Sequence, residues 1–260
     1  MLIDWSRSIE GEAVSVNVTD LAQLKQVLSG HFEKGQGFRV ATLNLDHVVK
    51  LRDDPSFHAA YLAHDYVTAD GNPIVWLSRL ARSPVSLVAG ADLIWPLVRL
   101  AAEKGVNVAL LGSTKETLDT ASEAMCDRYP SLKVVCRLAP PMGFDPTGDL
   151  AKAYCAELQA ANVGLCFLAL GAPKQERLAA FAAEHAPDVG FVSIGAGLDF
   201  IASTQTRAPW IVRRLAAEWL WRLLGNPRRL AGRYAACIAI LPRLTLSAWE
   251  ARRQKGQRPS

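Results

Sequence analysis

Continuous apolar runs alternate with amphipathic stretches of helical spacing through most of the chain. The runs "GFRVATLNL" (37–45), "VNVALLGS" (106–113) and "VGLCFLALG" (163–171) are typical of strands buried on both faces. The stretch "ADLIWPLVRLAAEKG" (91–105) instead spaces its apolar residues as a helix does and ends at glycine. This alternation predicts an α/β fold, a Rossmann-like and mostly parallel sheet with helices on both faces.

Weaker signals complete the predicted body. Apolar runs at 132–139 and 189–197 are expected to be strands, and so is "SPVSLVAG" (83–90). Helices are predicted over 114–130, 147–162 and 173–186, the last with Pro173 at its first position. From Arg207 onward the strand signal stops and only helical patterns remain.

Charge divides the chain in two. Residues 205–260 contain 12 Lys and Arg but only two acidic residues, whereas residues 1–204 contain 17 basic and 23 acidic residues. Four of the seven tryptophans also lie after residue 204. We therefore predict a Rossmann-like core (1–204), a helical, basic, Trp-rich appendage (205–250) and a disordered tail (251–260).

Several classes of protein are disfavoured by the sequence. The N-terminus lacks the basic and apolar regions of a signal peptide, and no segment offers about 20 uncharged apolar residues for a membrane span. The five cysteines are scattered without CxxC spacing, which favours reduced packing residues. We find no HExxH, paired-aspartate or GxSxG motif, so no metal site and no cofactor is predicted.

Ligands of an open parallel sheet bind beyond the carboxyl ends of its strands. The turns expected there read "TLNLDH", "TADGNP", "LLGST", "ALGAPKQE" and "IGAGLDF". In the fourth, Gly171 allows close approach of a ligand, the next helix offers free N–H groups, and Lys174 adds positive charge. Gly112 in "LLGST" marks a weaker phosphate loop. Asp70 in "TADGNP" is either a turn-shaping residue or a catalytic carboxylate.

Taken together, these segments resemble a known family. "TLNLDHVVKLRDD", "VTADGNPIVWLSR", "VALLGST", "LALGAPKQE" and "IGAGLDFIA" stand in the order typical of the WecB/TagA/CpsF glycosyltransferases, glycosyltransferase family 26. The resemblance covers about residues 10 to 235. It implies inverting, metal-independent transfer from a UDP-sugar to a polyprenyl-diphosphate-linked saccharide. The sugar would be N-acetylmannosamine, its uronic acid or glucose, used in polysaccharide or exopolysaccharide synthesis.

The resemblance also implies roles for individual residues. Asp70 occupies the position of the base that takes the proton from the acceptor hydroxyl. Asp199 would contact the sugar or cap a helix, and both readings stay open. The remaining residues expected to bind substrate are Thr42, Asn44, Gly71, Asn72, Gly112, Gly171, Lys174, Gln175 and Glu176.

Four arginines of the basic segment match family positions: Arg207, Arg222, Arg229 and Arg233. We expect them to neutralise the departing diphosphate or to bind anionic lipid. The sequence departs from the family at Leu87, Val88 and Gly232, where basic residues are common in relatives. Sugar specificity therefore does not carry over from any one relative.

The Trp- and Arg-rich helices predict a peripheral membrane protein. The resemblance implies that it lies on the inner, cytoplasmic face of the cell membrane. The alternative is that these helices pack on the body or form a homo-oligomer interface. A nucleic-acid partner is disfavoured, because so many large apolar residues suit lipid better. The competing functions are a Rossmann-type epimerase or oxidoreductase, which would require GxGxxG, and a non-catalytic binding module.

Overall fold

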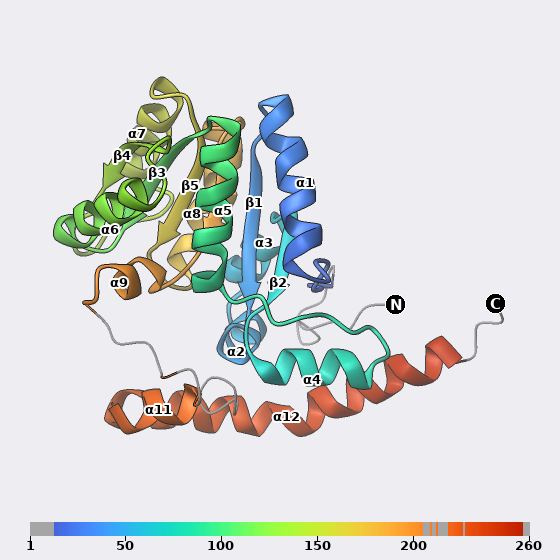
Figure 1. The fold of residues 1–260 in the computed structure, drawn as a ribbon. Helices are drawn as coiled ribbons and strands as arrows, with labels where there is room; N and C mark the ends of the chain where they lie inside the picture. Colours follow the sequence, from blue (N-terminus) through green and yellow to red (C-terminus); the bar gives the residue numbers. More distant parts are fainter. Residues whose placement is uncertain (1–12, 205–208, 210–211, 213–217, 226, 257–260) are drawn as a thin grey trace.

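The protein folds around one parallel six-stranded sheet in the order β2-β1-β6-β5-β3-β4 (Figure 1). The computed structural model describes residues 13–204, 209, 212, 218–225 and 227–256. Every neighbouring pair of strands is parallel, which confirms the predicted α/β class. The strands are β1 (Phe38–Leu43), β2 (Tyr66–Ala69), β3 (Asn107–Gly112), β4 (Lys133–Leu138), β5 (Val163–Ala169) and β6 (Gly190–Ser193).

Helices cover both faces of the sheet (Figure 1). One face carries α1 (Leu21–Lys34), α5 (Gly90–Lys104) and α6 (Lys115–Arg128). The other carries α3 (Pro55–Leu62), α7 (Asp149–Ala160) and α8 (Lys174–His185). Because successive side chains of a strand point to opposite faces, Phe167 packs in the first layer and Cys166 in the second. Burial on both sides explains why the strands are apolar at consecutive positions.

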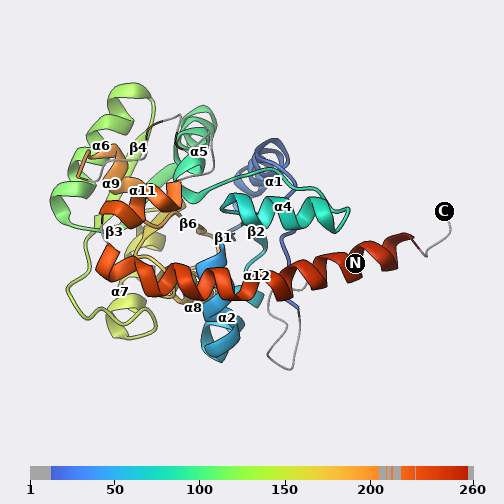
Figure 2. The ribbon, with the colours of Figure 1, turned by 90° about the horizontal axis from the view of Figure 1, so that it is seen from below.

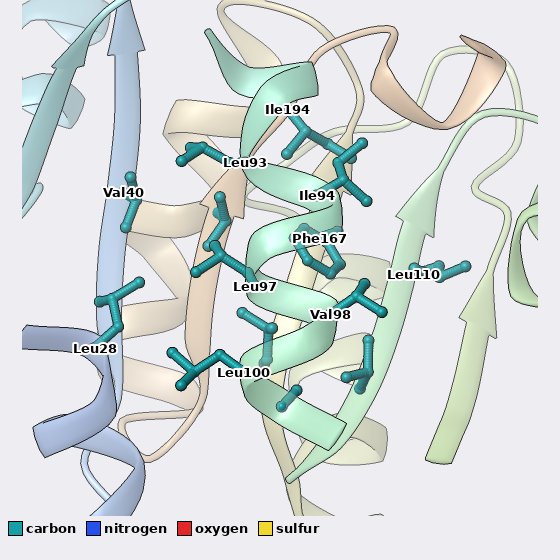
Figure 3. Packing of buried hydrophobic residues seen from close by; sticks show 14 of the residues in the cluster. Leu28, Val40, Leu93, Ile94, Leu97, Val98, Leu100, Leu110, Phe167 and Ile194 are labelled. Carbon is teal, nitrogen blue, oxygen red and sulfur yellow. The ribbon is translucent and has the colours of Figure 1, made fainter. Parts of the chain in front are cut away.

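Helix α5 forms the centre of the first layer (Figure 3). Leu93, Leu97 and Leu100 recur at helical spacing and pack against the strand residues Val40 and Phe167. The helix ends where Gly105 adopts a left-handed conformation, with φ 66°, which glycine adopts without strain.

A third apolar cluster joins the end of the chain to its beginning. It contains residues of α2 (Leu45–Asp53), α4 (Asn72–Leu80) and α12 (Pro227–Gly256). From α12, Leu244, Ala248 and Ala251 are buried in it. Helices α4, α12 and α11 (Glu218–Gly225) all lie on the side of the molecule toward which the strands point (Figures 1 and 2). The described helices of the basic segment, α11 and α12, therefore lie beside the carboxyl ends of the strands.

The prediction of a strand over residues 83–90 was wrong. The segment makes a single bridge, between Leu87 and Ala69, and the Val88 amide donates to the Ala69 carbonyl at 2.8 Å. The pairing does not extend back along β2, because the Val67 carbonyl accepts from the Asn17 and Val18 amides at 3.2 and 3.3 Å, and the Ser86 amide donates to the Thr19 carbonyl at 2.7 Å. At the other end of the chain, residues 251–256 continue α12 and are helical rather than disordered. Residues 257–260 lie outside the described part of the chain.

Candidate active site

Thr42 and Asp70 meet at the carboxyl edge of the sheet. Leu43 of β1 pairs with Ala69 of β2, so the two strands end side by side. The backbone amide of Asp70 donates to the Leu43 carbonyl at 2.8 Å. The Thr42 hydroxyl, buried in β1, makes a long 3.5 Å contact to Oδ2 of Asp70. The structure thus brings together a hydroxyl and a carboxylate that lie far apart in the sequence.

Asn44, Gly71 and Asn72 occupy the helix starts beside this pair. Asn44 is the N-cap of α2, and its side-chain oxygen accepts a hydrogen bond from the His47 amide at 3.0 Å. Gly71 precedes α4 with φ 119°, a conformation that favours glycine, and Asn72 is the first residue of that helix. Gly71 therefore has a backbone reason to be present, and Asn44 has a structural role in addition to the predicted contact with substrate.

Gln175 links the turns that follow β5 and β6. Its side-chain oxygen accepts from the Gly195 amide at 3.0 Å, and its side-chain nitrogen donates to Oε1 of Glu176 at 2.8 Å. Gly171 has φ 69°, and Lys174 begins α8 in a half-buried position. The side chain of Gln175 is 2% exposed, so it orders the loop around Gly171 from inside the protein.

Glu176 is completely buried behind this edge. Burial raises its pKa to about 7, against smaller opposing effects of the Gln175 hydrogen bond and the Lys50 charge. Within the described part of the chain, its Oε2 has no hydrogen-bond partner. Close by, the Tyr61 hydroxyl donates to the Thr42 carbonyl at 2.9 Å and lies 2.7 Å from Nδ1 of His47. The sequence predicted no role for Tyr61, which lies in no motif, or for His47, although it is the last residue of the "TLNLDH" turn.

We expect Glu176→Gln to change how stability depends on pH. The folded-state pKa of Glu176, about 7, exceeds its usual value of 4.5. Between these two pH values the native protein keeps a proton on Glu176 that the unfolded chain releases. This contribution to stability is present below pH 4.5 and is lost as pH rises through 7. Between pH 5 and 8 the wild type should lose about 2 to 3 kcal/mol relative to the variant.

Urea denaturation of both proteins at the two pH values measures this difference. The pKa values of His47 and His64 are lowered to about 4, chiefly by burial, and titrate in the opposite direction. They are common to both proteins and cancel in the comparison. Parallel pH profiles for the two proteins would contradict the assignment of Glu176.

The turns after β3 and β6 are joined by a third contact. Gly112 has φ 113°, and a Cβ there would lie 2.4 Å from the Ala169 carbonyl oxygen, so β5 passes too close for any side chain. The hydroxyl of Ser113, itself at φ 59°, donates to Oδ1 of Asp199 at 2.7 Å. The N-cap of α9 (Gly197–Ile201) is Ala196, so Asp199 is not that residue. A sugar contact by Asp199 stays a prediction.

Of the four arginines predicted to bind the diphosphate or lipid, the structure describes side-chain contacts for Arg233. Arg207 lies outside the described residues, and Arg222 and Arg229 lie on α11 and α12. Arg233 forms two hydrogen bonds with Asp46, at 3.0 and 2.6 Å. Lys50 pairs with the same carboxylate at 2.7 Å. Burial favours a higher pKa for Asp46, but the hydrogen bonds from Arg233 and Lys50 prevail and hold it at about 2.

Among the described residues, no three His, Cys, Asp or Glu side chains gather as a metal site would require. In the same part of the chain, no helix is both long enough and apolar enough to span a bilayer.

Comparison with protein families gives a match that covers nearly the whole chain. The model of the glycosyl transferase WecG/TagA/CpsF family matches residues 11–257. The resemblance inferred from the sequence motifs is thereby confirmed. The matched range includes all the strand-end turns described above together with α11 and α12. The protein is accordingly a glycosyltransferase of cell-surface polysaccharide synthesis, and the chain belongs to the WecG/TagA/CpsF family.

Proposed function

We propose that the protein is an inverting, metal-independent glycosyltransferase that uses a UDP-sugar. The sugar, of the N-acetylmannosamine, N-acetylmannosaminuronic acid or glucose type, passes to a polyprenyl-diphosphate-linked acceptor. The observation that carries this proposal is the Asp70 carboxylate beside Thr42, at the edge of the sheet where ligands of such folds bind.

The reaction requires one base and one stabilised leaving group. The acceptor hydroxyl attacks the anomeric carbon from the face opposite UDP, Asp70 takes the hydroxyl proton, and the bond from the anomeric carbon to the UDP oxygen breaks. The electron pair of that bond leaves with the diphosphate. Thr42 orients the carboxylate, and its own carbonyl is held by Tyr61.

The departing diphosphate gains negative charge, which fixed cations and helix N-termini stabilise. Lys174 stands in the first turn of α8, where the backbone N–H groups and the helix dipole also favour an anion. Arg233 approaches the same edge from α12 through its contact with α2. These groups support transfer without a metal ion.

The position of α4, α11 and α12 supports binding to the inner face of the cell membrane. These helices lie on the side of the molecule where the strands end (Figure 2). They carry large exposed side chains: Trp76, Trp219, Leu220, Trp221, Leu224, Ile238, Leu246 and Trp249. Tryptophan and leucine at headgroup depth, with arginine on anionic lipid, are typical of interfacial helices. A lipid-linked acceptor would then be presented to the carboxyl edge of the sheet.

The test is a panel of UDP-sugars offered with a polyprenyl-diphosphate saccharide while UDP release is followed. We expect one UDP-sugar to be turned over only when acceptor is present, and EDTA to leave the rate largely unchanged, because arginine and lysine neutralise the leaving group. Strict dependence on added magnesium or manganese would contradict the metal-independent mechanism. Turnover of no UDP-sugar with any lipid-linked acceptor would contradict the proposed function.

A further inference from the structure

Asp46 connects three separate segments of the chain. It stands in the first turn of α2, two residues after the N-cap Asn44, where the helix dipole favours a negative charge. It accepts two hydrogen bonds from Arg233 of α12 and forms an ion pair with Lys50, one turn further along α2. Lys50 in turn reaches the carbonyl of Ala172, in the loop before α8, at 3.4 Å.

The contact with Asp46 orients the Arg233 guanidinium and occupies only part of its hydrogen-bonding capacity. A guanidinium has five N–H donors in a fixed plane, and the bidentate pair with Asp46 engages only Nε and Nη2. The Arg233 side chain remains 45% exposed, so part of it stays accessible from solvent. Without Asp46, a long side chain on a surface helix would sample many rotamers.

Lys50 connects Asp46 to the loop around Gly171. Its contact with Ala172 lies between Gly171 and Lys174, the residues expected to meet the donor. The Asp46 carboxylate therefore holds one cation on α12 and a second cation next to the loop before α8.

We propose that Asp46 is a positioning residue for diphosphate departure, which fixes Arg233 and Lys50 so that their charges face the leaving group. The inference rests on the proposed function and assigns a role to a residue of the "TLNLDH" turn for which none was predicted. Asp46 does not touch the reacting atoms. It acts by holding the positive charges of Arg233 and Lys50 in place before the bond to UDP breaks. Charges that are positioned in advance stabilise a transition state most effectively.

A second ion pair provides a matched control. Asp65 and Arg39 form the same two-point contact, at 2.9 and 2.8 Å, with side chains 35% and 26% exposed. Arg39 lies near the start of β1 and Asp65 just before β2, so this pair is at the amino edge of the sheet, away from the strand-end turns. Asp65→Asn removes a comparable salt bridge and leaves the contacts of Asp46 with Arg233 and Lys50 unchanged.

We expect Asp46→Asn to lower kcat about 10- to 100-fold with a small change in KM for the acceptor, because the lost interaction acts on the transition state. Asp65→Asn should retain near wild-type kcat. Calorimetry with UDP, which needs neither acceptor nor turnover, should show about tenfold weaker binding in Asp46→Asn alone. Equal losses of kcat and of UDP affinity in Asp46→Asn and Asp65→Asn would show that Asp46 has only a structural role, and would overturn the proposal.

Chemical rescue separates positioning from general stability. In Arg233→Ala, added guanidinium at non-denaturing concentration should restore part of kcat, because Asp46 can hold the free cation where Arg233 stood. In the double variant Arg233→Ala/Asp46→Asn the same addition should restore nothing. Equal rescue in both, or rescue in neither, would overturn the proposal. Failure of the proposed function is a different result, namely absence of UDP release by the wild type in this assay, and UDP calorimetry still reports on Asp46 in that case.

Discussion

Asp70→Asn should reduce glycosyl transfer about 100- to 10,000-fold, the usual contribution of a positioned general base. Asparagine has nearly the shape of aspartate but cannot take the proton from the acceptor hydroxyl. The backbone amide of Asp70, which holds the turn to Leu43, is unaffected by the change. Binding of UDP and thermal stability should therefore remain close to those of the wild type. Initial rates of UDP release under saturating donor and acceptor measure the effect.

The same experiment decides between the two readings of Asp70. If the carboxylate only shapes the turn before α4, Asp70→Asn should lower the melting temperature and weaken donor binding together, with kcat little changed. Asp188→Asn, on the exposed segment before β6 at the opposite edge of the sheet, is the matched control and should behave as wild type. Near-normal turnover of Asp70→Asn would remove this residue from the mechanism.

The second large effect concerns the membrane. A triple variant in which Trp219, Trp221 and Leu224 are replaced by glutamine should lose about 100-fold in affinity for anionic vesicles. All three side chains are more than 40% exposed on α11. Removing about 1 kcal/mol of apolar insertion at each position accounts for the expected loss. Sedimentation with vesicles of phosphatidylglycerol and phosphatidylcholine measures it.

The control is a second triple glutamine variant at exposed apolar residues elsewhere, Val135, Met142 and Leu150. These lie on β4, on α7 or between them, at the opposite edge of the sheet from β2. This variant should sediment as the wild type does. Unchanged vesicle binding by the α11 variant would contradict the interfacial role, and its activity on a water-soluble acceptor would show whether the helix serves only to anchor.

The fold could be predicted from the sequence wherever periodicity reflects burial. Strands β1, β3 and β5 are apolar at consecutive positions because helices cover both their faces. The segment 83–90 misled the prediction because Val85, Leu87 and Val88 have a strand-like composition. Pairing depends on a neighbouring strand with an unoccupied edge, and the edge of β2 at Val67 is taken by Asn17 and Val18. Periodicity carries no information about such a neighbour.

The candidate site was only partly accessible to sequence reasoning. Motif order identified Thr42 and Asp70, which the structure places in contact. The pairing of Asp46 with Arg233 could not be predicted, because it joins residues 187 positions apart through the packing of α12 on α2. The internal role of Gln175, too, depends on a backbone amide from another turn.

The strand order has a consequence for how the chain reaches its native state during synthesis. Strand β6 is the last to be made, yet it lies between β1 and β5. Until residues 190–193 have left the ribosome, the nascent chain can form only two separate half-sheets, β1 with β2 and β3 with β4 and β5. The late strand joins them and brings the Gly195 amide to Gln175. Loop-closure entropy makes such long-range pairing slow. Until β6 pairs, β1 and β5 would each expose an unpaired strand edge in the nascent chain.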